Sequence, residues 1–182
     1  MNLHQQQLQE QKRYRQLYGM CSHYGQYIHG KDFIDFFISK FNPKKVLDVG
    51  CGDNGFCKLM KVKSVKCVGV DFASPQADQI AFAHNLPFKN KSFEWIVAFD
   101  VMEHLLPNEI HDVLKEFVRI VSKGLVFSIC YRLANTNHND YLTDKRNLHL
   151  TVQPEKWWIE QLSQYIYVQK HKQYLYGLLN DS

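Results

Sequence analysis

A glycine-rich turn with acidic neighbours is the segment of this sequence best suited to chemistry. Residues 46–55 read Val-Leu-Asp-Val-Gly-Cys-Gly-Asp-Asn-Gly, which places Gly50, Gly52 and Gly55 at the spacing GxGxxG. Glycines at this spacing allow a tight turn and a close approach of the backbone to a nucleotide cofactor. Asp71 lies 21 positions after Gly50 (71 − 50 = 21). This separation is typical of a carboxylate that binds ribose hydroxyls.

The charges at this turn indicate what kind of nucleotide it suits. Asp48 and Asp53 flank the glycines, and their carboxylates would repel a pyrophosphate, which binds best to bare backbone amides at a helix N-terminus. A cationic nucleoside without phosphate fits an acidic turn better. S-adenosylmethionine is such a ligand, because it carries an ammonium and a sulfonium beside a ribose diol. A dinucleotide cofactor stays the alternative on the GxGxxG spacing alone.

The elements that must position this turn are short apolar strands. Five are predicted from their apolar runs: Lys45–Val49, Lys66–Asp71, Gln79–Ala83, Trp95–Asp100 and Leu125–Tyr131. Several are apolar on both faces, which indicates parallel pairing, since parallel sheets carry helices on both faces. Residues 72–78 are too few for an ordinary helical crossover, so we expect the helix there to shrink to about one turn.

Helical periodicity accounts for much of the remaining chain. Apolar residues at i, i+3 and i+4 spacing predict helices over 3–18, 31–41, 108–122 and 154–164, and two short candidate strands follow at 165–170 and 172–178. Strands that alternate with helices predict the α/β class, here a Rossmann-like, doubly wound sheet that is mostly parallel and has helices on both faces.

The length of 182 residues fits one domain at about 100–200 residues per domain. We divide it into an N-terminal helical cap at 1–42, a cofactor-binding core at 43–131, and a substrate-side loop with the C-terminal helix and strands at 132–182. The cap carries Tyr18, His23, Tyr24 and His29, which would either cover the cofactor or form a surface lid without chemistry.

Composition narrows the partners and the compartment. No apolar run approaches the roughly 18 residues of a membrane span, and the first residues show no apolar signal segment, so we expect no membrane contact and a cytoplasmic location. The five cysteines include no CxxC pair and are interpreted as reduced thiols. The net charge of +4 comes from scattered Lys and Arg, so nucleic acid is not expected as a partner.

Four segments in this order resemble the class I S-adenosylmethionine-dependent methyltransferases. They are VLDVGCGDNG at 46–55, VGVDFAS at 68–74, NLPFKNKSFEWIVAFDVMEHL at 85–105 and GLVFSIC at 124–130. The resemblance implies a seven-stranded sheet with a C-terminal antiparallel strand and a cofactor lying over the carboxyl ends of the strands. It also implies S-adenosylmethionine as the cofactor and S-adenosylhomocysteine as its product.

The resemblance further implies roles for individual residues. Carried over position by position, the cofactor-binding set is Asp48, Gly50, Cys51, Gly52, Asp71, Phe72, Ala83, His84, Leu86, Asp100 and Val101. The glycine turn would line the methionine part, Asp71 would bind the ribose and Phe72 would pack on the adenine. Related sequences usually carry an Asp where Phe82 stands here, which leaves adenine recognition to backbone amides and apolar contacts.

Histidines near the strand ends are the candidate catalytic residues. His104 follows the fourth predicted strand, and His138 and His149 lie in or next to the loop after the fifth. We take His104 and His149 as candidate bases for a hydroxyl acceptor, whereas an amine that arrives neutral needs little help. The His, Asp and Glu residues show no recognisable ligand spacing, so no metal is expected.

The expected function is therefore methyl transfer to an oxygen or nitrogen of a small or medium-sized acceptor, such as a metabolite or a sugar-like molecule. Two alternatives remain open. A non-catalytic S-adenosylmethionine-binding or scaffolding protein is suggested by Phe82, and a dinucleotide-dependent oxidoreductase by the GxGxxG spacing.

Overall fold

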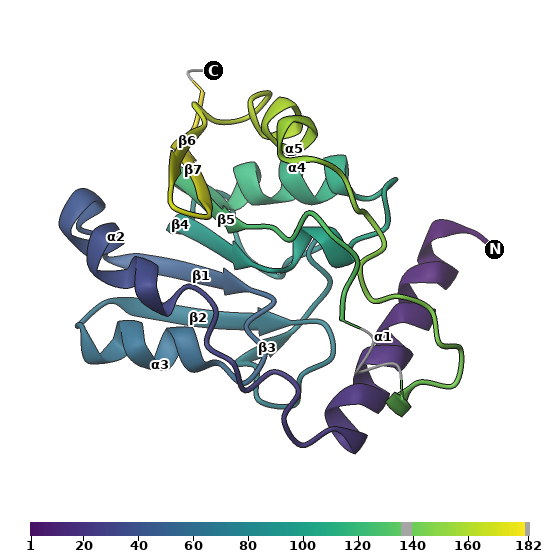
Figure 1. Cartoon of the computed structure of the whole chain (residues 1–182). Coiled ribbons are helices and arrows are strands. Elements are labelled where there is room, and N and C mark those ends of the chain that lie inside the picture. Colours follow the sequence, from purple (N-terminus) through teal and green to yellow (C-terminus); the bar gives the residue numbers. More distant parts are fainter. Residues whose placement is uncertain (136–139, 181–182) are drawn as a thin grey trace.

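The computed structural model describes residues 1–135 and 140–180, which fold around one mixed β-sheet (Figure 1). Its strands lie in the order β3-β2-β1-β4-β5-β7-β6. Their bounds are β1 Lys45–Val49, β2 Lys66–Asp71, β3 Gln79–Ile80, β4 Phe93–Phe99, β5 Val121–Ser128, β6 Gln169–His171 and β7 Tyr174–Leu178. Strands β1 to β5 pair in parallel, whereas β7 is antiparallel to both β5 and β6. The predicted Rossmann-like sheet with its antiparallel C-terminal strand is confirmed.

Helices cover both faces of this sheet. Their bounds are α1 Leu3–Met20, η1 Lys31–Phe33, α2 Ile34–Phe41, α3 Gly55–Val62, η2 Met102–His104, α4 Ile110–Ile120 and α5 Glu155–Leu162. Figure 1 shows α2 and α3 on one side, α4 and α5 on the other, and α1 beyond the carboxyl ends of the parallel strands. Within the described residues we find no helix with the length and apolar character to cross a membrane; the cytoplasmic location stays a prediction.

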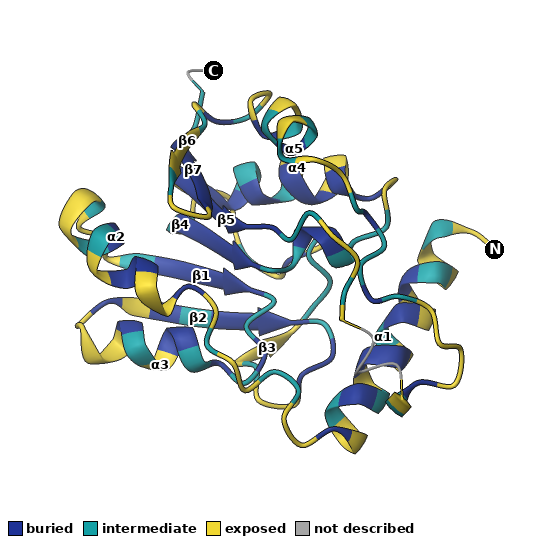
Figure 2. Cartoon of the chain, in the orientation of Figure 1, coloured by how far each residue is buried: buried dark blue, intermediate teal, exposed yellow. Residues whose placement is uncertain are grey.

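The two faces of the sheet bury separate apolar clusters. Val46 and Leu47 are neighbours on β1 and are both fully buried, but they belong to different clusters, because successive strand side chains point to opposite faces. One cluster joins the sheet to α4 and α5 through residues such as Phe117 and Trp158, and the other joins it to α2 through Phe37. In Figure 2 the central strands β1, β2, β4 and β5 are accordingly mostly dark blue, whereas the outer sides of the helices carry yellow.

Five strand predictions need correction at their ends. The two C-terminal strands are Gln169–His171 and Tyr174–Leu178, both shorter than the predicted 165–170 and 172–178. β4 begins at Phe93 and ends at Phe99 and β5 runs over Val121–Ser128, each earlier than predicted, because Phe93 pairs with Val121 across an irregular register. The third strand is only Gln79–Ile80, since β2 ends at Asp71 and offers no longer partner. The expected one-turn helix over 72–78 is also wrong, as this connection consists of turns and bends.

A third apolar cluster fixes α1 to the rest of the molecule. Tyr14 and Leu17 of α1 pack against Leu142 and Leu148, from the segment that follows β5. Arg13 is buried beside them, and its guanidinium donates at 2.7 Å to the carbonyl oxygen of residue 146. The N-terminal helix and the chain after β5 thus meet across the carboxyl ends of the strands.

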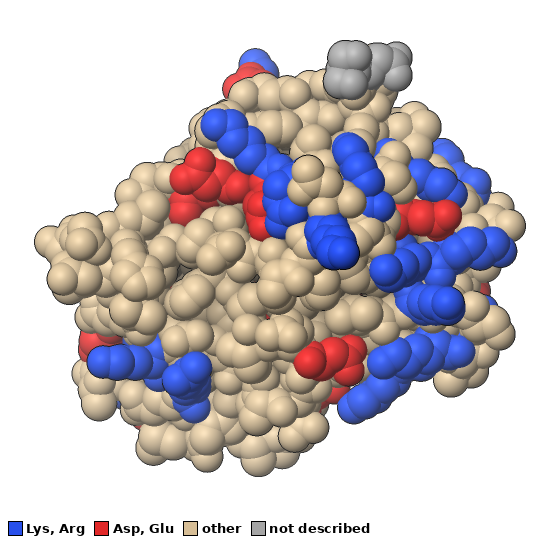
Figure 3. Space-filling model, turned by 180° about the vertical axis from the view of Figure 1, so that it is seen from behind, with Lys and Arg blue, Asp and Glu red and all other residues tan. Residues whose placement is uncertain are grey.

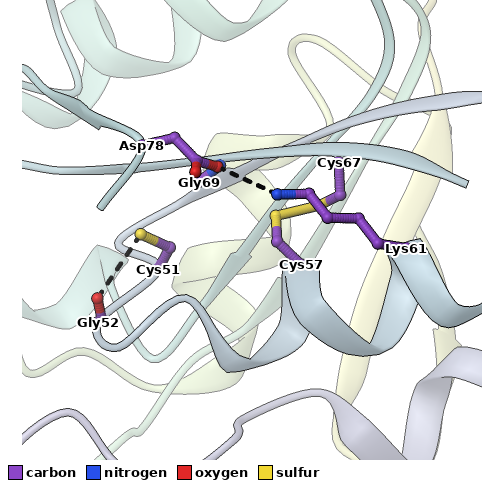
Figure 4. Close-up of a disulfide and its surroundings, with 7 residues drawn as sticks. All are labelled: Cys51, Gly52, Cys57, Lys61, Cys67, Gly69 and Asp78. Atoms are coloured by element: carbon purple, nitrogen blue, oxygen red, sulfur yellow. Dashed lines mark hydrogen bonds and ion pairs between the residues drawn. A yellow bond between two sulfur atoms is a disulfide. The ribbon is translucent and has the colours of Figure 1, made fainter. Parts of the chain in front are cut away.

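The cysteines do not all remain reduced. Cys57 of α3 and Cys67 of β2 form a disulfide (Figure 4), which corrects the prediction of five free thiols. Because α3 packs on β2, the two Cα atoms lie 5.0 Å apart, within the range that a disulfide spans. Cys21, Cys51 and Cys130 are free, and Figure 4 shows Cys51 at the glycine turn, apart from the disulfide.

Candidate active site

The glycine turn between β1 and α3 excludes side chains at two positions. Gly50 and Gly52 have φ angles of +75° and +53°, in the left-handed region that glycine adopts readily. A Cβ at Gly50 would lie 2.3 Å from a Cγ atom of Val101, and one at Gly52 would lie 2.9 Å from the carbonyl oxygen of Gly25. The turn therefore requires glycine both for its backbone conformation and because Val101 and Gly25 approach it closely.

Asp71, at the end of β2, holds this turn in place. Its Oδ2 accepts a hydrogen bond from the N–H of Gly52 at 3.2 Å and one from the hydroxyl of Tyr18 at 3.3 Å. Its Oδ1 accepts from the N–H groups of Ala73 and Ser74 at 2.8 and 2.9 Å. Burial raises the pKa of this carboxyl, although the backbone donors oppose the rise. The Tyr18 hydroxyl thus occupies a hydrogen-bonding position on Asp71 Oδ2 that a ribose hydroxyl would need.

Two adjoining cavities open at the carboxyl ends of the parallel strands. The larger has a volume of about 690 Å³ and the smaller about 120 Å³. The residues that line both are Tyr18, Tyr24, Gly50, Asp100 and His104. Open α/β sheets bind their ligands at this edge, so the two cavities together form the candidate site.

The structure places nearly all the predicted site residues around these cavities. The larger cavity is lined by Asp48, Gly50, Cys51, Gly52, Asp100, His104 and His149, and the smaller by Gly50, Asp71, Phe72, Ala83, His84, Asp100, Val101 and His104. Leu86 lies instead in the core against α4, and it lines neither cavity. Phe82 lines the smaller cavity and stacks on His84 with ring centroids 5.5 Å apart.

The larger cavity is acidic. Asp48, Asp100 and Glu103 line it, and Arg132 is the one Lys or Arg among the described lining residues. Burial and the neighbouring Asp71 raise the pKa of Asp48 to about 8. Because a nearby cation would favour the ionised form of this carboxyl, the cavity suits a positively charged ligand.

Asp100 lies where the two cavities meet and is held by two partners. His29 Nδ1 lies 2.5 Å from Asp100 Oδ2, and the hydroxyl of Ser128 donates to Oδ1 at 2.9 Å. Burial raises the pKa of Asp100, but the contact with His29 outweighs it, so the pKa is lowered overall. The residue also has a φ of +52°, and non-glycine residues in such conformations cluster at functional sites.

The two candidate histidines meet on the side of the cavity that faces the chain after β5. Their ring centroids lie 4.6 Å apart at an interplanar angle of 87°. His104 Nδ1 lies 3.0 Å from the carbonyl oxygen of Leu148 and 2.6 Å from the hydroxyl of Tyr14. His149 Nδ1 lies 2.5 Å from the carbonyl oxygen of Arg132. Each ring is therefore fixed through its Nδ1 atom.

The surroundings of His104 make it a weak base. Burial and the neighbouring His149 lower the pKa of His104 to about 3, and a group with so low a pKa accepts protons poorly at neutral pH. His104 is thus poorly suited to act as a base, and His149 is the remaining candidate. His138, the third histidine considered from the sequence, lies outside the described residues.

Glu103 connects η2 to the chain after β5. Its Oε1 accepts from the N–H of Cys130 at 2.7 Å, and its backbone oxygen accepts from the N–H groups of Leu150 and Thr151 at 2.8 and 3.0 Å. Its Oε2 is buried without a hydrogen-bond partner. Burial and the charge of Asp100 raise the pKa of this carboxyl to about 8.

Sequence reasoning missed the contribution of α1 to the smaller cavity. Gln7, Glu10 and Tyr14 line it, and Gln7 also donates to a carboxylate oxygen of Glu109 at 2.5 Å. The available signal was their spacing of three and four positions, which continues to Leu17 and places them on one helix face. Polar residues on such a face resemble a solvated surface, so the pattern alone does not show that they are buried.

Basic side chains are unevenly distributed over the face seen in Figure 3. There Lys and Arg are most numerous on the half that carries α2 and α3, away from α1, and Asp and Glu lie between some of them. A dense basic surface is the electrostatic footprint of nucleic-acid binding. The charge distribution agrees better with a small ligand in the acidic cavity.

Solved structures share this fold at low sequence identity. A protein from Pyrococcus horikoshii OT3 has a TM-score of 0.65 and 16% identity, with 84% of this chain and 89% of that chain covered. Magnesium protoporphyrin IX methyltransferase from Synechocystis PCC 6803, solved with bound S-adenosylhomocysteine, has a TM-score of 0.62 and 13% identity, with 93% of both chains covered.

Curated relatives match over a shorter region. Norajmaline N-methyltransferase from Rauvolfia serpentina is 22% identical over 127 residues, which are 58% of this chain and 43% of that protein. Ajmaline N-methyltransferase from the same plant is 25% identical over 105 residues, 48% of this chain and 35% of that protein. The matches thus span less than half the length of these relatives.

A family model decides the assignment. The model described as a methyltransferase domain matches residues 13–172, which include the glycine turn, Asp71, η2 and His149. The structural neighbour from Synechocystis holds S-adenosylhomocysteine, the product of the cofactor that the resemblance implied. The chain therefore belongs to the methyltransferase-domain family of class I S-adenosylmethionine-dependent methyltransferases.

Proposed function

We propose that this chain transfers a methyl group from S-adenosylmethionine to an oxygen or nitrogen of a small or medium-sized acceptor. The observation that supports this most strongly is the acidic cavity of about 690 Å³ beside the glycine turn. Small-molecule sites commonly measure about 300–1,000 Å³. Since this cavity must hold both the methionine part of the cofactor and the acceptor, a metabolite or sugar-like molecule fits better than a macromolecule.

The residues present fit the cofactor. Gly50 and Gly52 leave space that any Cβ would fill, and Asp48 and Asp100 make the adjoining cavity attractive to an ammonium and a sulfonium. Asp71 has the carboxylate oxygens to bind ribose hydroxyls once the Tyr18 hydroxyl moves away. When bound there, the cofactor supplies a methyl group on a sulfur that is already a good leaving group.

The protein's own contribution is alignment, exclusion of water and, for some acceptors, proton transfer. Helix α1 and the chain after β5 cover the strand ends, and holding two reactants in line converts a bimolecular step into an effectively unimolecular one. For a hydroxyl acceptor, His149 would accept the proton. His104 would hold its place through Tyr14 and Leu148. A neutral amine would attack without a base.

Methyl-transfer assays with labelled S-adenosylmethionine test this proposal. Panels of phenols, sugars, hydroxy acids and amines are supplied one class at a time, and S-adenosylhomocysteine formation is measured together with the labelled product. We expect one class to give turnover, with Gly50→Val as the inactive control. Tight S-adenosylhomocysteine binding without transfer to any class would instead favour a non-catalytic cofactor-binding protein, for which Phe82 in the smaller cavity is the specific observation.

The base assignment has its own test once a hydroxyl acceptor is known. His149→Ala should lower kcat by about 10²–10⁴-fold and remove one limb of the pH–rate profile while S-adenosylmethionine affinity stays nearly unchanged. His111→Ala is the matched control, because His111 lies on α4 outside both cavities. Full turnover of the His149 variant would show that alignment alone is sufficient.

A further inference from the structure

Glu103, His104 and His149 form a cluster that methyl transfer by alignment does not require. Each residue offers one atom that could bind a metal ion, and these three atoms all lie within 4.8 Å of one another. Glu103 and His104 are adjacent on η2, whereas His149 lies 149 − 104 = 45 positions further along the chain. The cluster lines the larger cavity.

Glu103 has a buried carboxylate oxygen that lacks a partner. The residue is fully buried, and although Oε1 accepts from the N–H of Cys130 at 2.7 Å, Oε2 has no hydrogen bond. A buried polar atom without a partner is costly, and in native proteins it usually signals a missing water, ion or functional role. This oxygen is therefore available to a cation in the cavity.

The two histidines are held in the way that metal ligands usually are. A carbonyl oxygen can only accept, so the contact of His149 with Arg132 favours a proton on its Nδ1. Nδ1 of His104 contacts both the carbonyl oxygen of Leu148 and the hydroxyl of Tyr14. A proton on this Nδ1 satisfies the carbonyl oxygen, and the Tyr14 hydroxyl can accept from the same N–H. Each Nε2 then carries a free lone pair. Metal-binding histidines typically donate their second ring N–H to a backbone carbonyl or carboxylate, which fixes both the tautomer and the ring orientation.

The chain after β5 is fastened to η2 at this point. The N–H groups of Leu150 and Thr151 both donate to the backbone oxygen of Glu103, and the Thr151 hydroxyl donates to the carbonyl oxygen of Leu105 at 2.8 Å. These bonds fix His149 beside η2 through the backbone. The third side chain of the cluster is thus positioned as firmly as the adjacent pair.

We propose that Glu103, His104 and His149 bind a divalent transition-metal cation, with zinc as the best match. Two imidazole nitrogens and one carboxylate oxygen are the protein ligands of catalytic zinc sites and of the related facial triads. Such sites leave coordination positions open, and here these positions face the larger cavity. The sequence did not predict this site because its three ligands are not spaced as a local metal-binding motif.

This site also narrows the range of expected methyl acceptors, an inference that rests on the proposed function. A bound cation lowers the pKa of a hydroxyl that it coordinates, so the acceptors would be molecules with a metal-binding oxygen, such as phenols or hydroxy acids. His149 Nε2 would then be a ligand rather than a base. The cation would favour the ionised acceptor oxygen, and the proton of the acceptor hydroxyl would pass to solvent water instead of to a histidine.

The test is a metal titration of the full chain after chelator treatment, without cofactor or acceptor. Zinc chloride is added in a calorimeter, and cobalt chloride is added in parallel as a spectroscopic probe. We expect one saturable zinc site per chain. Glu103→Gln keeps an acceptor for the Cys130 N–H but loses the charged ligand. This variant and His149→Ala should each weaken zinc binding by more than about tenfold, the smallest loss typical even of an outer-shell partner, whereas His111→Ala should leave it unchanged.

Two kinds of result would overturn this site. Absence of saturable zinc binding would mean that Glu103 is simply buried without a cation. Binding that survives both ligand variants, or that is lost in Cys130→Ser together with a sulfur-to-cobalt charge-transfer band, would place the metal elsewhere. His149→Cys supplies another zinc ligand and should retain binding if His149→Ala fails to fold. Because no cofactor is present, the result does not depend on methyl transfer.

Discussion

The cofactor side and the acceptor side of the candidate site are built in different ways. On the cofactor side, the glycine turn and Asp71 come from one stretch of chain, residues 46–71, and the backbone N–H of Gly52 donates to the Asp71 carboxylate. On the acceptor side, Tyr14, His104 and His149 come from three distant segments and meet through side chains. The first half depends on local conformation, whereas the second depends on the assembled fold.

This difference indicates which half can change its chemistry. Replacing a glycine of the turn affects backbone geometry that every ligand needs, because a Cβ would collide with neighbouring chain. Side chains of the acceptor side can be exchanged while the backbone stays in place. We therefore expect substitutions on the cofactor side to abolish binding, and substitutions on the acceptor side to alter turnover or local order.

The largest effect is expected for Gly50→Val. The new side chain would collide with Val101, and its φ of +75° is strained for a branched residue, at a strain of about 1–3 kcal/mol. S-adenosylhomocysteine binding should disappear in calorimetry and Tm should fall. Gly19→Ala is the matched control, since nothing lies within 4 Å of a Cβ there. Normal binding by the Gly50 variant would place the cofactor elsewhere.

Asp71→Asn should weaken binding without destroying the turn. An amide keeps one oxygen as an acceptor but loses the charge, and hydrogen bonds to a charged group contribute about 1.5–3 kcal/mol. S-adenosylhomocysteine affinity should fall roughly 10–100-fold. Asp78→Asn is the control, because Asp78 follows the same strand and lines neither cavity. Equal affinity of the two variants would remove Asp71 from the binding site.

Arg13→Ala tests the acceptor side. The guanidinium of Arg13 is buried and contacts Glu10 at 2.6 Å and Asp144 at 3.1 Å. Because Arg146 also pairs with both carboxylates, we expect the loss of stability to be smaller than the cost of about 3–5 kcal/mol for leaving a buried charge unpaired. Amide hydrogen exchange over residues 140–148 should quicken at least about tenfold, while the parallel strands stay protected. Arg15→Ala, on the exposed side of α1, should change neither region. Equal acceleration of exchange in the strands would mean that the two halves unfold together.

Cofactor binding should release a proton from Asp48. Burial and Asp71 raise its pKa to about 8, so the carboxyl is mostly protonated at pH 7, and a bound cation would lower that pKa. Calorimetry with S-adenosylmethionine in two buffers of different ionisation enthalpy should show up to about one proton released at pH 7 and little above pH 9. Asp48→Asn should abolish the difference. Proton uptake would contradict the assignment.

The smallest effect is expected for Tyr18→Phe. Its hydroxyl donates to Asp71 Oδ2, and removing this competitor leaves the oxygen free for a ribose hydroxyl. One net hydrogen bond of about 0.5–1.5 kcal/mol corresponds to S-adenosylhomocysteine affinity up to roughly tenfold tighter. Tyr167→Phe, at an exposed position outside both cavities, serves as the control. Weaker binding would mean that the Tyr18 hydroxyl contacts the cofactor itself.

Local patterns were sufficient for most of the fold. The apolar runs around Val46 and Val68 predicted β1 and β2, because a strand buried on both faces has few polar residues. The end of β3 was not predictable in this way, since it depends on where its partner β2 stops at Asp71. The disulfide required knowing that α3 packs on β2, which neither Cys57 nor Cys67 reveals alone.

In the candidate site, too, the features that depend on local sequence could be predicted, whereas those that depend on the assembled fold could not. Gly50, Gly52 and Asp71 could be predicted because a turn and the following strand end are one local unit. The pair of His29 and Asp100 could not, since 71 positions separate them (100 − 29) and the contact depends on how the cap crosses the sheet.

The most direct test of the account is a calorimetric titration of the full chain with S-adenosylhomocysteine and, separately, with NADH. At about pH 9, where the Asp48 carboxyl is mostly ionised, the turn beside Asp48 and Asp71 should accept the phosphate-free nucleoside and repel the dinucleotide. We predict saturable binding of S-adenosylhomocysteine at one site per chain and no saturable binding of NADH. Tighter binding of NADH, or binding of neither ligand, would contradict the assignment of these cavities to S-adenosylmethionine.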